Sequence, residues 1–104
     1  MVIEMPKLES TFQAGLVRDI YRLFPGCMVL KLDPVYIQGM PDLLVLYGSR
    51  WAVLECKRSK DAVHKPNQDY YVSLLDGMSF ARFIFPENKE EVLHELQSAF
   101  QSSR

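Results

Sequence analysis

The spacing of apolar residues predicts three helices. Apolar side chains recur every three or four residues through 7–24 and again through 87–101, which is the period of an amphipathic helix. Pro25-Gly26 ends the first pattern, and another helix is predicted to begin at Pro66 and end at Gly77. The expected core-facing positions are Leu8, Phe12, Leu16, Ile20 and Leu23 in the first helix, Tyr70, Tyr71, Leu74 and Leu75 in the second, and Val92, Leu93, Leu96 and Phe100 in the third.

Four apolar segments predict strands. They cover residues 27–32, 43–47, 51–57 and 79–85, and Asp33-Pro34 and Pro86 end two of them. The order along the chain is α-β-β-β-α-β-α. It predicts an α/β fold class of the α+β type, in which a mixed sheet carries helices on its faces. The chain has 104 residues, of which 48% are apolar, and this predicts a single domain over 1–104 with one modest core.

The second and third strands are joined by Gly48-Ser49. Glycine at the first position of a two-residue loop is typical of a type II′ turn, which fixes the register between the strands. In that register Asp42 lies directly opposite Glu55, with the Cβ atoms about 4.5–5.5 Å apart. Lys57 shares their face of the sheet, because it follows Glu55 by two residues. The residues between the acids are apolar on both faces, which is typical of central, covered strands.

Two adjacent carboxylates repel each other unless a cation compensates them. Mg²⁺ or Mn²⁺, which prefer oxygen ligands, would do so between Asp42 and Glu55. The ammonium group of Lys57 could then position a water or stabilise charge on a phosphate. The alternative is that all three are ordinary charged residues at the solvated ends of two strands.

These residues also resemble a known motif. Pro41-Asp42 followed by Glu55-Cys56-Lys57 resembles the pattern of PD-(D/E)XK nucleases, and Gly39-Met40-Pro41-Asp42 followed by Gln68 resembles the VRR-NUC branch. The resemblance covers residues 9 to about 85. It implies a restriction-endonuclease-like core and the hydrolysis of phosphodiester bonds.

The resemblance implies a role for each matching residue. The catalytic set would be Asp42, Glu55, Lys57 and Gln68, and the metal ligands would be Asp42, Glu55, the backbone carbonyl oxygen of Cys56 and Glu9 on the first helix. Glu9 is also explained by the favourable interaction of an acid with the start of a helix. Related nucleases often carry a tyrosine four residues after the glutamine, whereas here tyrosines follow Gln68 at two and three residues.

Basic residues follow the third strand closely. The net charge of −1 gives no general attraction to nucleic acid, but Arg58, Lys60, His64 and Lys65 continue from Lys57 and predict a local DNA-binding strip together with Gln68. The alternative is a solvated loop, and His64 and His94 are themselves predicted to be solvated.

Cysteine usage and hydropathy bear on location. Cys27 and Cys56 are predicted to be unbridged and buried. No segment approaches the roughly 20 apolar residues that cross a bilayer. Both features predict an intracellular, cytoplasmic protein that does not interact with a membrane.

Together these features predict a metal-dependent DNA endonuclease that uses Mg²⁺ or Mn²⁺. Its substrate would be duplex or branched DNA, including flaps and four-way junctions, and a homodimer would allow two strands to be cut. Two other classes fit the sequence. One is a non-catalytic module that binds nucleic acid or a partner, and the other is a globular subunit of a larger assembly.

Overall fold

The helices and strands follow one another in the predicted order. The structure is a computed structural model that describes the backbone of residues 7–101 and the side chains of residues 10–101. Its helices are α1 (Lys7–Leu23), α2 (Gln68–Met78) and α3 (Lys89–Gln101), and its strands are β1 (Met28–Lys31), β2 (Leu43–Tyr47), β3 (Arg50–Cys56) and β4 (Ala81–Ile84). The predicted order of elements is confirmed.

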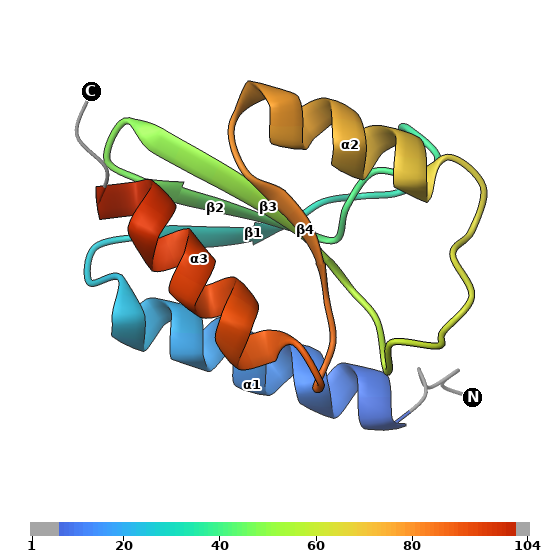
Figure 1. Cartoon of the computed structure of the whole chain (residues 1–104), viewed down its shortest axis with the longest axis horizontal. Coiled ribbons are helices and arrows are strands. Elements are labelled where there is room, and N and C mark those ends of the chain that lie inside the picture. The colour runs from blue at the N-terminus through green and yellow to red at the C-terminus, as the bar shows by residue number, and fades with distance from the viewer. Residues whose placement is uncertain (1–6, 102–104) are drawn as a thin grey trace.

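The four strands form one mixed sheet in the order β1-β2-β3-β4. β1, β2 and β3 pair antiparallel, whereas β3 and β4 pair parallel. A parallel pair needs a crossover connection, and α2 provides it. α1 and α3 lie on one side of the sheet and α2 lies on the other (Figure 1). The protein is therefore an α+β domain built on a mixed sheet, as the sequence predicts.

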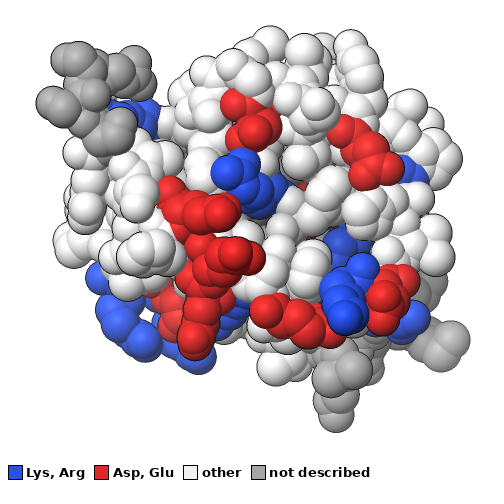
Figure 2. Space-filling view, in the orientation of Figure 1, with Lys and Arg blue, Asp and Glu red and all other residues white. Residues whose placement is uncertain are grey.

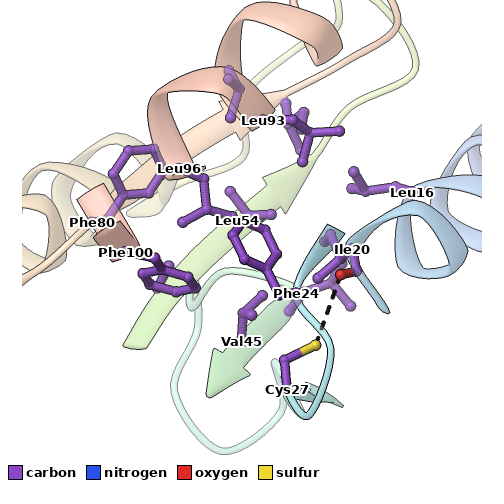
Figure 3. Close-up of a cluster of buried hydrophobic side chains, with 14 of the residues drawn as sticks. Leu16, Ile20, Phe24, Cys27, Val45, Leu54, Phe80, Leu93, Leu96 and Phe100 are labelled. Carbon is purple, nitrogen blue, oxygen red and sulfur yellow. Dashed lines mark hydrogen bonds between the residues drawn. The ribbon is translucent and has the colours of Figure 1, made fainter. Parts of the chain in front are cut away.

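One face of the sheet carries the hydrophobic core. Leu43, Val45, Ala52 and Leu54 are completely buried on this face. They pack against apolar side chains that come from α1, from the turn after it and from α3 (Figure 3). These are chiefly Leu16, Ile20, Phe24, Leu93, Leu96 and Phe100. Since a buried Leu or Phe side chain contributes roughly 1.5–3 kcal/mol, this face supplies most of the hydrophobic stabilisation.

The opposite face is only partly covered. Leu44, Leu46 and Trp51 are half-buried there, and Met28 and Leu30 on β1 are exposed. The cause is the position of α2, which packs mainly against β3 and β4. The prediction that the two strands between the acids are covered on both sides is therefore only partly right for β2.

Two helices differ in detail from the prediction. Leu23 is exposed, and Phe24 in the following turn is buried instead. In α2, Tyr70 and Leu74 face solvent, because the less exposed stripe consists of Gln68, Tyr71, Val72 and Leu75. The predicted stripe was correct at Tyr71 and Leu75 only.

The ends of α2 also differ from the prediction. Asn67 has a left-handed φ of 72°, which is not helical, so α2 begins at Gln68 rather than at Pro66. Gly77 lies within the last turn, and the helix ends where the backbone N–H of Ser79 donates to the carbonyl oxygen of Leu75.

Two further predictions can be compared with the described part of the chain. Cys27 and Cys56 are both free and buried, as predicted. Among residues 7–101, no helix combines the length and the apolar character needed to span a membrane.

Candidate active site at the open end of the hairpin

The turn between β2 and β3 sets the predicted register. Gly48 has a φ of 63°, a conformation that glycine adopts without steric cost. Tyr47 pairs with Arg50 at the closed end, and Leu43 pairs with Leu54 near the open end. The next position outward on each strand is an acid, Asp42 on one side and Glu55 on the other.

The side chain of Asp42 replaces a backbone hydrogen bond where the pairing of β2 with β3 ends. Pro41, which precedes it, is buried and has no N–H to donate to β3. The Oδ2 atom of Asp42 instead accepts a hydrogen bond from the backbone N–H of Cys56 at 2.9 Å. The N–H and C=O groups of one strand residue point to the same side. The carbonyl oxygen of Cys56 therefore faces the same side as the Asp42 carboxylate.

Burial raises the pKa of the Asp42 carboxyl group above its ordinary value of 3.8. The backbone N–H of Cys56, the charge of Lys57 and a hydrogen bond with the side chain of Glu55 all act in the opposite direction. The loss of solvation is the largest of these effects. A nearby cation would favour the charged form of this carboxylate.

Lys57, Glu55 and Gln68 form a buried polar chain. Their exposed fractions are 6%, 4% and 8%. The Nε2 atom of Gln68 donates to Oε2 of Glu55 at 2.9 Å, and its Oε1 accepts from Nζ of Lys57 at 2.7 Å. The same Nζ lies 3.9 Å from Oε2 of Glu55. Buried charges are costly unless they are paired and hydrogen-bonded, and the ammonium group of Lys57 and Oε2 of Glu55 meet both conditions.

The segment between β3 and α2 provides another partner for the lysine. The Nζ atom of Lys57 donates to the carbonyl oxygen of Val63 at 3.0 Å. An ammonium group has three N–H donors, and Gln68 and Val63 take two of them. Lys57 also lines the pocket, so its third N–H could be directed to a water or a phosphate oxygen there.

The start of α2 is held by contacts on two sides. The backbone N–H of Lys65 donates to Oε1 of Gln68 at 2.7 Å, so the chain just before α2 orients the side-chain amide of Gln68. On the other side, Gly39 lies against Asn67. A Cβ atom added to Gly39, whose φ is 93°, would come within 2.6 Å of Cβ of Asn67. Only glycine permits this approach, which brings residues 33–40 against the start of α2.

These segments enclose a pocket of about 200 Å³. Residues 34–40 form one side, and the end of β3 and the start of α2 form the rest. Six of the predicted site residues line it, namely Asp42, Glu55, Cys56, Lys57, Lys65 and Gln68. The sequence therefore identified most of the polar lining of this pocket.

The donor atoms at this site suit a hard cation. Two carboxylates and a backbone carbonyl offer the oxygen ligands that Mg²⁺ and Mn²⁺ prefer. Within the described residues, no group of three or more His, Cys, Asp or Glu side chains is placed to hold a metal ion. Mg²⁺ commonly binds through one or two carboxylates and keeps several waters, so the residues present fit such an ion.

The other predicted residues have different environments. The His64 ring stacks on Phe83 with centroids 4.0 Å apart, and its Nδ1 lies 2.7 Å from Oδ1 of Asp69. His64 is exposed, as predicted, but these two contacts also hold its ring in place. Glu9 belongs to α1, but its side chain lies outside the described residues, so its metal-supporting role stays a prediction.

Charge near the site is mixed. On the face shown in Figure 2, several acidic side chains adjoin one another, and the basic side chains lie in separate groups that do not form a continuous basic surface. Arg58, Lys60 and Lys65 are exposed on the segment after β3, whereas Lys57 is buried. The predicted strip thus separates into exposed cations, of which Lys65 also lines the pocket, and the buried Lys57.

Sequence reasoning missed several contributors to the pocket, among them the polar side chain of Gln38 in its wall. The carbonyl oxygen of Val63 fixes Lys57, but a main-chain atom leaves no signature in the side-chain pattern. Met40 lines the wall. Its place between Gly39 and Pro41 is the only signal that could have pointed to it.

Comparison with known proteins gives no match. No protein-family model fits the sequence, and no curated protein or solved structure is detectably similar to the chain. Any function must therefore rest on the residues and geometry of the site.

Proposed function

We propose that the protein is a metal-dependent endonuclease that hydrolyses DNA phosphodiester bonds. The supporting observation is the pocket in which Lys57 and Gln68 are locked against Glu55 beside Asp42. Burying polar groups this deeply costs stability that apolar side chains in the same positions would not cost. A site that binds a cation and a phosphate gives a reason for their placement.

In this proposal the protein's residues divide the work. Asp42, Glu55 and the carbonyl oxygen of Cys56 would hold Mg²⁺ or Mn²⁺. When bound, the ion would supply charge neutralisation at the phosphate and a water of lowered pKa. Lys57 would use its third N–H to orient the attacking water or to stabilise charge on a phosphate oxygen. Gln68 would hold Lys57 and Glu55 in place without itself reacting.

The fold is consistent with the resemblance found in the sequence. A mixed sheet with the order α-β-β-β-α-β-α is the core expected for PD-(D/E)XK nucleases. The VRR-NUC resemblance implies that Gln68 reaches the metal site, and the contacts of Gln68 with Glu55 and Lys57 support this role. We therefore propose a restriction-endonuclease-like, VRR-NUC-like domain.

The choice of DNA as substrate rests on the surroundings of the pocket. Arg58, Lys60 and Lys65 are exposed on the segment that closes one side of it, where they can contact phosphates. A homodimer would place two such sites on one substrate and enlarge a small footprint. Branched DNA, such as a flap or a four-way junction, is the substrate class we favour.

The proposal is tested with purified protein, Mg²⁺ or Mn²⁺, and plasmid, flap and junction DNA. Wild type should cut at least one substrate, and Asp42→Ala should lose activity by about 100-fold or more, the size of losing one transition-state charge contact. Asp61→Asn removes an exposed acid from the neighbouring segment and serves as the matched control, with unchanged activity expected. Equal residual cleavage by wild type and Asp42→Ala would mean that a contaminant cuts the DNA.

Calorimetric titration with Mn²⁺ separates the enzyme from a non-catalytic module. The enzyme should bind Mn²⁺, and Glu55→Gln should weaken that binding. Two results together would favour the non-catalytic alternative. They are binding of DNA without binding of Mn²⁺, and no change in binding on Glu55→Gln.

A further inference from the structure

The segment before β2 presents apolar side chains to solvent beside the candidate active site. Val35 and Tyr36 are each 88% exposed. Their backbone is nevertheless held, because the N–H of Val35 donates to Oδ1 of Asp33 at 2.9 Å and the N–H of Tyr36 donates to the carbonyl oxygen of Asp33 at 3.4 Å. Asp33-Pro34 is a favoured start for such a turn. Val35 and Tyr36, the tip of this segment, are therefore presented to solvent by an ordered turn.

A second pocket lies under this tip. It has a volume of about 360 Å³, and Leu32, Tyr36, Ile37 and Met40 line it together with Asp33. Its lining is almost entirely apolar, in contrast to the polar candidate active site. The two pockets share Met40 as a common wall. A ligand in the apolar pocket is therefore separated from the candidate active site by the side chain of Met40.

This pair of pockets matches the two chemical parts of a nucleotide. A phosphodiester is anionic and suits the pocket that contains Lys57 and Lys65. A nucleobase is flat and aromatic, and it gains from stacking on a tyrosine ring and from an apolar wall. In a duplex the base faces are stacked on one another, so only an unpaired base is accessible to Tyr36.

We propose that Tyr36 and the apolar pocket bind an unpaired nucleobase of DNA whose phosphate lies in the candidate active site. The inference rests on the proposed nuclease function and names its substrate class, which is DNA with a single-stranded arm. Packing gives no alternative reason for the side chain, because a tyrosine that is 88% exposed adds little to the core.

The test measures binding in EDTA, so that cleavage plays no part. Fluorescence anisotropy would compare a blunt duplex with the same duplex carrying a thymidine arm. Wild type should prefer the arm-bearing DNA. Tyr36→Leu should weaken binding to that DNA by about tenfold, as expected for the loss of one base stack, and should leave blunt-duplex binding unchanged. Tyr36→Phe keeps the ring and should behave as wild type.

Two outcomes would overturn the inference. One is equal binding of the arm-bearing DNA by wild type and Tyr36→Leu, which would leave the exposed tip for a protein partner. The other is an equal loss on both substrates, which would indicate a general contact with the duplex. Failure of the nuclease proposal is a separate result, because it appears as absent cleavage by wild type in Mg²⁺ or Mn²⁺ whatever the binding data show. Circular dichroism of each variant confirms folding.

Discussion

The two ends of the β2–β3 hairpin have opposite chemistry. At the closed end, Tyr47 stacks with Phe100, with ring centroids 5.6 Å apart, and both rings contact Phe24. At the open end, the same two strands end in Asp42 and Glu55, and Glu55 contacts Gln68 in a polar pocket. Aromatic packing stabilises the fold directly, whereas buried charge does so only through specific partners. The closed end therefore serves the fold, and the open end holds the candidate active site.

The largest expected effect on stability comes from the closed end. Phe100→Ala should lower the free energy of unfolding by about 3–5 kcal/mol, because it leaves a cavity among three rings. Urea denaturation measures this loss. The variant's folded fraction should still bind Mn²⁺ as wild type does, since Phe100 does not line the pocket. Loss of Mn²⁺ binding in the folded fraction would show that the two ends are not independent.

The second prediction concerns the polar chain at the open end. Gln68→Leu removes the amide between Lys57 and Glu55 and leaves both groups without that partner. Stability should fall by about 1–3 kcal/mol, and cleavage should fall by roughly 10–100-fold, as for other residues that position a metal site. Unfolding curves and cleavage rates measure the two effects. Gln101→Leu, on the exposed end of α3, is the control and should change neither. Normal cleavage by Gln68→Leu would remove Gln68 from the site.

Glycines at the two ends provide a matched pair of substitutions. Gly48→Ala places a Cβ in open space, so it should cost only the roughly 1–2 kcal/mol of a left-handed alanine. Gly39→Ala adds a steric clash with Asn67 to a similar backbone cost. It should therefore be the more destabilising variant and should also lower cleavage. Thermal unfolding gives the order, and equal costs would mean that residues 33–40 can move away from α2 freely.

The smallest expected effects are pH dependences of opposite sign. The pKa of Asp42 is raised by burial, so the folded state binds more protons than the unfolded state above pH 3.8, and wild-type stability falls as the pH rises through that window. Without metal, Asp42→Asn should therefore unfold at a higher temperature than wild type at neutral pH. The gain should disappear below pH 3.8.

Asp19 provides the opposite case. Its pKa is lowered mainly by a hydrogen bond from Lys89, whose Nζ lies 2.6 Å away, so its stabilising effect is present above pH 3.8 and is lost as the pH falls through the lowered value. Asp19→Asn should unfold at a slightly lower temperature than wild type at neutral pH and match it in acid. Thermal unfolding across a range of pH measures both variants. If both substitutions changed the unfolding temperature at neutral pH in the same direction, the predicted opposite signs would be wrong.

The sequence predicted the hairpin register and the buried face of α3 better than the buried face of α2. Periodicity identified the buried residues of α3, and the Gly48-Ser49 turn set the register that brings Asp42 opposite Glu55. The stripe of α2 was misplaced, because Asn67 starts the helix later than Pro66 and Gln68 occupies a sheet-facing position. A polar residue at such a position is invisible to a search for apolar spacing.

Tertiary contacts explain the remaining differences. The environment of His64 depends on Phe83 and Asp69, which come from other elements. The fixing of Lys57 depends on a main-chain oxygen of Val63. Neither contact follows from local sequence pattern, because both depend on how the chain between β3 and α2 folds back.

The arrangement around Lys57 has a consequence for affinity. A free lysine side chain has about 2 kcal/mol of rotamer entropy, which it would lose if it first became ordered on binding a ligand. Here the contacts with Val63 and Gln68 remove that freedom when the chain folds. In the proposed function, a phosphate that entered the pocket would meet an amine already immobilised, so more of the interaction free energy would be available for binding and for lowering the activation barrier.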